Sequence, residues 1–110
     1  MNKEKKKTQG MIHVWLKNPG EEPVKRFIPN QLEFLQMFVG GYIETFTITH
    51  NVVIICNEEG KLKGLPYNCT VCREDFVGNV IMAGTAEDEF ADVMLSEELL
   101  KEMFPGFWKK

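Results

Sequence analysis

The stretch YIETFTITHNVVIICN (residues 42–57) decides the fold, because it contains two successive strand patterns with a polar break between them. Residues 42–50 are rich in β-branched and aromatic side chains, which favour strands. Residues 51–57 form a nearly continuous apolar run, which is typical of a central strand that is buried on both faces. The polar break at His50 and Asn51 predicts a tight hairpin link between the two strands.

Another hairpin is predicted before this stretch. Aliphatic side chains occupy every second position of MIHVWLK (11–17), which is the two-residue period of a strand. VKRFI (24–28) is a second, shorter strand pattern. The segment NPGEEP (18–23) between them holds two prolines and a glycine, which indicates a turn.

The residues PNQLEFLQMFVGG (29–41) predict a helix. Asn30 is suited to cap its start, and Gly40 and Gly41 are suited to end it. The predicted core stripe consists of Leu32, Leu35 and Val39. Three further apolar side chains widen the apolar arc beyond half of the circumference: Phe34, Met37 and Phe38. A helix with so wide an arc is covered on two sides or used at an interface.

The second half of the chain predicts fewer regular elements. NEEGKLKGLP (57–66) is a charged turn, and residues 66–75 predict a loop with one helical turn. FVGNVIMAG (76–84) predicts a strand that a glycine interrupts, and residues 85–95 form an acidic connection. SEELLKEMF (96–104) predicts a short helix, which its first serine caps and a following Pro-Gly pair ends.

The order of these elements is β-β-α-β-β-β-α. Strands joined by short loops, with few helices, indicate an α+β fold with a mostly antiparallel sheet of about five strands. We expect both helices on one face of this sheet. A single domain over residues 11–110 is predicted to follow a flexible basic leader over residues 1–10.

Composition narrows the classes of function. The chain has 110 residues, of which 44% are hydrophobic, and a formal net charge of −3. Four lysines lie in the leader, so the remaining body is more acidic, which argues against binding of the nucleic-acid backbone. No apolar run approaches the roughly 18 residues of a membrane span, and no apolar segment of a signal peptide follows the leader. We therefore expect a cytoplasmic protein without a membrane partner.

Three segments together resemble a known family: GGYIETFTI (40–48), NVVIICNEEGKLKGLPYN (51–68) and FVGNVIMAG (76–84). They are similar to a family of small proteins of bacteriophages, plasmids and conjugative elements that is described only as a domain of unknown function. The resemblance covers about residues 11–104. It implies a protein of a mobile element and supplies no activity.

The most specific parts of the resemblance are GYIE (41–44) and NEEGKLKGLPYN (57–68). The chain departs from the family pattern at two places. Cys69 stands where the family commonly has a basic residue, and the linker over residues 73–76 is short. The resemblance therefore implies no role for a basic side chain after Asn68.

The charged turn over residues 57–66 has more features than a turn needs. A hairpin turn accounts for Gly60 as a position of positive φ, and for Leu62 as a side chain that points inward. Asn57 and the charged residues around it remain unexplained, so we interpret the turn also as the edge of a site that binds a ligand or partner. The candidate site residues are Tyr42, Glu44, Asn57, Glu58, Glu59, Lys61 and Asn68.

Other constellations of reactive residues are weaker. Cys69 and Cys72 form a C-x2-C pair that Cys56 and His50 could complete as a zinc site, but a single pair is a weak signal, and the odd number of cysteines favours reduced thiols. No phosphate-binding or nucleophile motif is present, so we expect no cofactor. Four acidic residues lie close together in the sequence but lack the spacing of a calcium loop, so we interpret them as a solvated face. They are Glu87, Asp88, Glu89 and Asp92.

These observations favour a small non-catalytic binding protein of a phage or mobile element. Its expected use is counter-defence, through sequestering a host protein or a small signalling ligand. One alternative is a small enzyme in which Glu58 or Glu59 acts as a general acid or base. Another is a homodimer formed through the first helix and the aromatic tail, whereas in a monomer the tail would fold back over that helix. The residues of this interface are Phe34, Met37, Phe38, Phe107 and Trp108.

Overall fold

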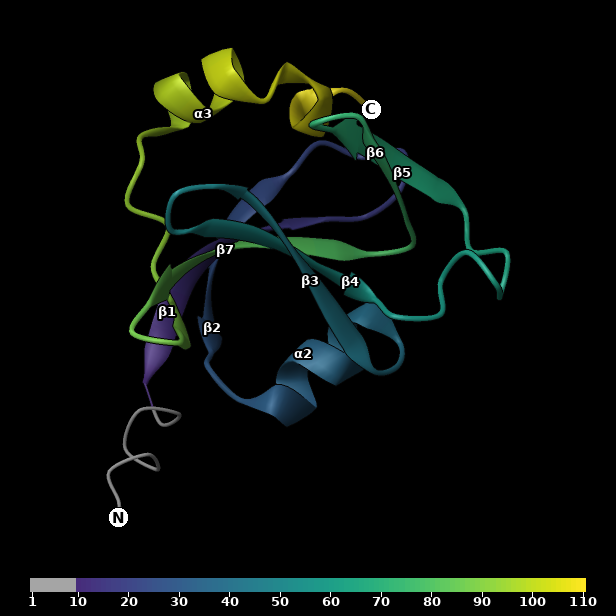
Figure 1. Cartoon of the computed structure of the whole chain (residues 1–110), viewed down its shortest axis with the longest axis horizontal. Coiled ribbons are helices and arrows are strands. Elements are labelled where there is room, and N and C mark those ends of the chain that lie inside the picture. Colours follow the sequence, from purple (N-terminus) through teal and green to yellow (C-terminus); the bar gives the residue numbers. More distant parts are fainter. Residues whose placement is uncertain (1–9) are drawn as a thin grey trace.

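A six-stranded antiparallel sheet forms the middle layer of the molecule (Figure 1). The computed structural model describes residues 10–110, so the predicted leader lies outside the described residues except for its last position. The sheet has the order β2-β1-β7-β4-β3, and β8 pairs with β7 beside β1. Its strands are β1 (Met11–Lys17), β2 (Val24–Pro29), β3 (Ile43–Thr49), β4 (Val52–Asn57), β7 (Val80–Ala86) and β8 (Glu89–Ala91).

Each face of the sheet has its own cover. Helix α2 (Leu32–Val39) lies on one face. The hairpin of β5 (Tyr67–Val71) and β6 (Glu74–Val77) lies on the other, together with α3 (Glu97–Met103) and the short 3-10 helix η1 (Pro105–Trp108). Figure 1 shows α2 below the sheet, with α3 and the hairpin above it. The predicted α+β class is therefore confirmed, but the prediction that both helices share one face is wrong.

The reason for the two covers is the apolar character of β4 on both of its faces. All six of its residues are buried. Val52 and Ile54 face the hairpin and η1, whereas Val53 and Ile55 face α2. Full burial of one such side chain contributes roughly 1.5–3 kcal/mol, so neither face can remain open to water. This confirms the predicted central strand, which begins at Val52 and is joined to β3 by a turn at His50 and Asn51.

The first helix is shorter than predicted. Pro29 still belongs to β2, and Gln31 precedes the helix without a side-chain cap. Asn30 does not cap it, because its Nδ2 donates to the Phe90 carbonyl at 3.0 Å. Leu35 and Val39 are buried as predicted. Leu32 is 52% exposed, since it begins the helix beyond the edge of the core.

The prediction of a loop over residues 66–75 is wrong, because this region forms the β5–β6 hairpin. Cys72 and Arg73 both have positive φ, at 53° and 67°, between the paired residues Val71 and Glu74. This is the two-residue turn that usually contains Asn-Gly. Because neither residue is a glycine or asparagine, the sequence carries no signal of the turn.

The predicted strand over residues 76–84 is split into the end of β6 and the start of β7. Gly78 has a φ of +73°, and a Cβ at this position would approach Leu65 to 2.8 Å. The chain therefore turns at Gly78 and leaves the small sheet for the large one. The acidic connection over residues 85–95 also contains an unpredicted strand, β8, which follows a second turn of positive φ at Glu87 and Asp88.

The last helix agrees with its prediction. Ser96 Oγ accepts a hydrogen bond from the Leu99 backbone N–H at 3.2 Å, as an N-cap should. Leu100 is fully buried, and Phe104 and Phe107 continue the apolar contact beyond the helix. Within residues 10–110, no helix combines the length and apolar character needed to cross a membrane.

Replacing Cys72 by Asn and Arg73 by Gly should stabilise the chain. A left-handed conformation costs an ordinary residue about 1–2 kcal/mol, and Asn-Gly adopts this turn readily. We expect the free energy of unfolding to rise by about 1 kcal/mol or more and the melting temperature by roughly 4 °C or more, measured by thermal unfolding. The control is Glu21→Asn with Glu22→Gly in an exposed turn where neither residue has positive φ. A variant that melts no higher than this control would contradict the turn.

Candidate functional site

The edge pocket is a hollow of about 110 Å³ between the sheet, the segment after β4 and the β5–β6 hairpin. Four of the seven candidate residues line it. Two further carboxylates come from β6, and two aromatic rings, Phe46 and Phe76, contact each other with centroids 5.2 Å apart. The polar residues of the edge pocket are Glu44, Asn57, Glu58, Lys61, Glu74 and Asp75.

Asn57 holds the backbone that shapes this pocket. Its side chain is buried, and its Nδ2 donates to the Val39 carbonyl in the last turn of α2 at 3.1 Å. Its Oδ1 accepts from the Glu59 N–H at 2.8 Å. A Cβ on Gly41 would lie 3.0 Å from the Asn57 Nδ2, so the glycine permits this close approach. Asn57 is therefore a positioning residue and leaves Glu58 directed at the pocket rim.

The segment over residues 57–66 connects the large sheet to the small one and is not a hairpin turn. Leu62 is 90% exposed, so the prediction that it points inward is wrong. Leu65 packs instead, against the positions of Gly60 and Gly78. The prediction of positive φ at Gly60 is wrong, because the glycine with positive φ in this segment is Gly64, at 69°. Gly60 is needed for space, because a Cβ there would lie 2.9 Å from the Val77 side chain.

The charges of the pocket do not cancel. Lys61 Nζ lies 3.1 Å from Glu74 Oε2, and both side chains are partly exposed, so the pair contributes at most about 1 kcal/mol. Asp75 accepts a hydrogen bond from Thr70 at 2.7 Å. Within the described part of the chain, no lysine or arginine pairs with Glu44 or Glu58. The pocket therefore presents an excess of carboxylates.

Three candidate residues lie away from the pocket wall. Glu59 turns to Lys63, whose Nζ is 3.6 Å from its Oε1. Tyr42 is 71% exposed, and its carbonyl accepts a hydrogen bond from the Glu58 N–H at 2.8 Å. Asn68 is buried on β5, where its Nδ2 donates to the carbonyls of Lys17 and Gly78 at 2.9 and 2.7 Å. Its position indicates a structural role.

The residues of the predicted interface lie on opposite faces of the sheet. On α2, Phe34 and Phe38 pack against the core, whereas Met37 is 69% exposed. Trp108 lies on the other face, with its ring centroid 5.4 Å from that of Trp15. Phe107, next to it, is fully buried. The aromatic tail therefore folds onto the sheet, and it does not form one continuous surface with the first helix.

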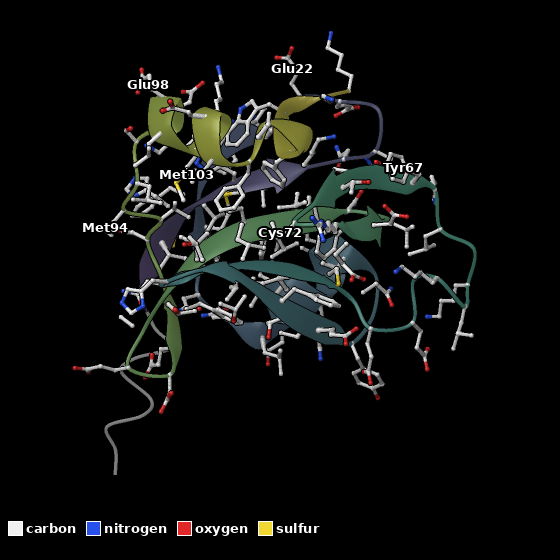
Figure 2. All side chains as sticks on the ribbon, turned by 45° about the horizontal axis from the view of Figure 1, so that its top comes forward. Glu22, Tyr67, Cys72, Met94, Glu98 and Met103 are labelled. Atoms are coloured by element: carbon white, nitrogen blue, oxygen red, sulfur yellow. The ribbon has the colours of Figure 1, made fainter. Side chains whose placement is uncertain are left out.

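The cysteines are spread over different environments. Cys56 and Cys69 are buried, and burial is the main cause that raises the pKa of each thiol to about 11. Both are therefore protonated at neutral pH. Cys72 is exposed at the turn beyond β5, whereas Tyr67 marks the beginning of that strand (Figure 2). Among residues 10–110, no group of three histidine, cysteine or carboxylate side chains has the arrangement of a metal site.

Lys17 is an unusual buried residue that the sequence analysis missed. Its side chain is fully buried, and neither its Nζ nor the Oδ1 of Asn68 has a hydrogen-bond partner among the described groups. Burial lowers the pKa of Lys17, against smaller opposing effects of Cys69 and Glu21. The alternation of β1 does contain a signal for this burial, because Lys17 lies on the same face of the strand as Trp15, which is also buried.

The model of a domain of unknown function (DUF3846) matches residues 12–105. The chain belongs to this family. The DUF3846 match includes the whole edge pocket and, apart from Met11 at the start of β1, every strand and helix up to the start of η1. Searches of curated proteins and of solved structures found no significant match.

Replacing Lys17 by Met should stabilise the protein at pH 7. Burial of an ammonium group without a partner costs energy that an apolar side chain of similar length avoids. We expect a gain of about 1–3 kcal/mol in urea unfolding. Because the folded-state pKa of Lys17 is lowered, its penalty is complete at low pH and disappears as the pH rises toward the ordinary value of 10.5. The gain should shrink over the same range.

The matched control for this substitution is Lys109→Met, at an exposed lysine. It should change the free energy of unfolding by less than about 0.5 kcal/mol. A loss of stability in Lys17→Met at pH 7 would show that the buried amine makes a favourable interaction, and it would contradict this account of β1.

Proposed function

We propose that this DUF3846 chain is a non-catalytic binding protein whose edge pocket receives a positively charged side chain of a partner. The observation that carries the proposal is the gathering of Glu44, Glu58, Glu74 and Asp75 around one hollow with a single lysine. Carboxylates attract an ammonium or guanidinium group, and hydrogen bonds between charged groups are stronger than neutral ones.

The size of the pocket supports a side chain over a whole small molecule. Sites for drug-sized ligands have volumes of roughly 300–1,000 Å³. The edge pocket has about 110 Å³, which suits one extended side chain. Of the two kinds of partner expected from the sequence, a protein therefore fits this pocket better than a small signalling ligand.

The aromatic rings favour arginine among the cationic side chains. Phe46 and Phe76 line the pocket together with the carboxylates. A guanidinium group stacks on aromatic faces and also makes two parallel hydrogen bonds to a carboxylate, which an ammonium group cannot do. Arginine is also among the residues that dominate the energy of protein interfaces.

The enzyme alternative has less support. Acid–base catalysis requires its groups within hydrogen-bond reach of one reacting atom. Glu58 lines the pocket, whereas Glu59 pairs with Lys63 outside it. The pairing of Glu59 with Lys63 therefore supports a binding role for this segment more than joint acid–base action of the two neighbouring glutamates.

The proposed setting is a phage or other mobile element, where the chain would sequester a host protein and so counter host defence. Two observations support it: the resemblance of residues 40–84 to proteins of such elements, and the acidic character of the body. An acidic surface binds partners with basic patches and accelerates their association.

The test uses Nα-acetyl-arginine amide as the probe and follows backbone amide signals by nuclear magnetic resonance. We expect shifts confined to residues around Glu44, Asn57, Glu58 and Phe76. Glu58→Gln should weaken binding about tenfold, because a hydrogen bond to a charged group contributes roughly 1.5–3 kcal/mol. Its melting temperature should stay unchanged, since Glu58 is exposed.

The neighbouring residue provides the matched control. Glu59→Gln removes the same charge one position away, outside the pocket wall, and should leave binding within about twofold if the pocket geometry determines affinity. Equal effects of the two substitutions on binding would show that the probe responds only to the overall charge of this region and not to the geometry of the edge pocket. Shifts located elsewhere would contradict the proposed site.

A further inference from the structure

The last strand of the sheet order, β3, has a free edge among the described strands, because it pairs only with β4. An edge strand presents backbone N–H and C=O groups that another chain can pair with. The opposite edge, β2, carries Lys25, Arg26 and Pro29, and charges and proline discourage such pairing. β3 has a single charged residue, Glu44, and its bulge lies at the far end, between Thr47 and Thr49.

The two faces of β3 open into two different hollows. Glu44 and Phe46 line the edge pocket on the face of the β5–β6 hairpin. Thr45 and Thr47 line a larger groove of about 760 Å³ on the face of α2. We call this the threonine groove; its other walls include Leu32 at the start of α2 and the turn between β7 and β8. Successive residues of β3 therefore face alternate hollows.

Both hollows have acidic rims. In the threonine groove the carboxylates come from the β7–β8 turn, where Glu87 and Asp88 are exposed and line the opening. A strand that paired with the edge of β3 would direct its own side chains alternately to the two faces. Adjacent residues of that strand would thus meet carboxylates on both sides, which requires basic side chains at consecutive positions.

We propose that β3 accepts an extended basic segment of a partner protein as an additional strand. Backbone hydrogen bonds hold the segment along Ile43–Thr47, and consecutive arginine or lysine side chains enter the edge pocket and the threonine groove. This inference deepens the proposed function and rests on it for the edge pocket. It adds the conformation of the partner segment and the second hollow.

A second copy of the chain fits this edge poorly. Pairing of β3 with another β3 would bring the acidic rims of the two chains side by side. Like charges on paired strands are destabilising. Charge complementarity therefore selects a basic segment of another protein over self-association.

The probe for this inference is the peptide acetyl-Val-Arg-Lys-Arg-Val-amide, whose central residues are basic on both strand faces. Its binding to the full chain is measured by nuclear magnetic resonance, together with hydrogen exchange of the β3 amides. A matched peptide carries N-methyl groups on two adjacent central residues, which blocks both edges of its backbone and keeps its charge. We expect the first peptide to bind at least tenfold more tightly and to slow exchange at the edge of β3.

A variant of the chain separates the two hollows. Thr45→Lys places a positive charge in the threonine groove, at an exposed position on the face away from the edge pocket. It should weaken the peptide at least tenfold and leave the binding of Nα-acetyl-arginine amide unchanged. The control, Val24→Lys on the opposite edge strand, should leave both affinities unchanged.

The outcomes are distinguishable. Equal affinity of the two peptides, an unaffected Thr45→Lys variant, or no peptide binding at all would overturn strand addition. As long as acetyl-arginine amide still binds at the edge pocket, none of these results would contradict the proposed function. A loss of arginine binding would instead remove the proposed function, on which this inference rests.

Discussion

The side-chain amide of Asn57 is the contact on which the geometry of the site depends. It stands at the end of β4, where the central strand leaves the core, and it joins the last turn of α2 to the backbone of Glu59. One buried side chain thereby connects the helix on one face of the sheet to the segment that crosses to the other. Because both of its polar atoms are satisfied inside the protein, they fix the direction of Glu58 and the wall of the edge pocket.

The open surface around β3 follows from the lengths of the elements. Helix α2 has eight residues and is about 12 Å long, whereas β3 has seven residues and extends over about 23 Å. The helix therefore covers only part of its face of the sheet, and the threonine groove is the remainder. On the other face the β5–β6 hairpin packs through Phe76 and leaves the edge pocket beside Glu44. Both hollows therefore exist because the elements that pack on the two faces of the sheet are too short to cover the whole of β3.

The sequence predicts those parts of the fold in which burial or capping leaves a periodic pattern. The apolar run of β4 and the cap at Ser96 are two examples, and both are confirmed. The β5–β6 hairpin could not be predicted, because its turn places Cys72 and Arg73 in conformations that usually need Asn-Gly.

Part of the site could also be predicted. The charged segment after β4 was recognised because a turn alone does not need its side chains, and the structure places Glu58 and Lys61 at a pocket. Glu74 and Asp75 were missed, since they reach the pocket through the unpredicted hairpin. Asn57 was predicted as a binding residue, and only the structure shows that both of its polar atoms are used inside the protein.

The central claim is that the Asn57 amide holds the helix and the pocket together, and Asn57→Asp tests it most directly. The substitution keeps the shape and the acceptor for Glu59, but it removes the donor to Val39 and places a charge beside that carbonyl. Urea unfolding at pH 7 should show a loss of roughly 3 kcal/mol or more. Burial raises the pKa of such a carboxyl, so the deficit relative to the unchanged protein should narrow as the pH falls and the neutral acid donates instead. A variant as stable as the unchanged protein, or a deficit independent of pH, would contradict the claim.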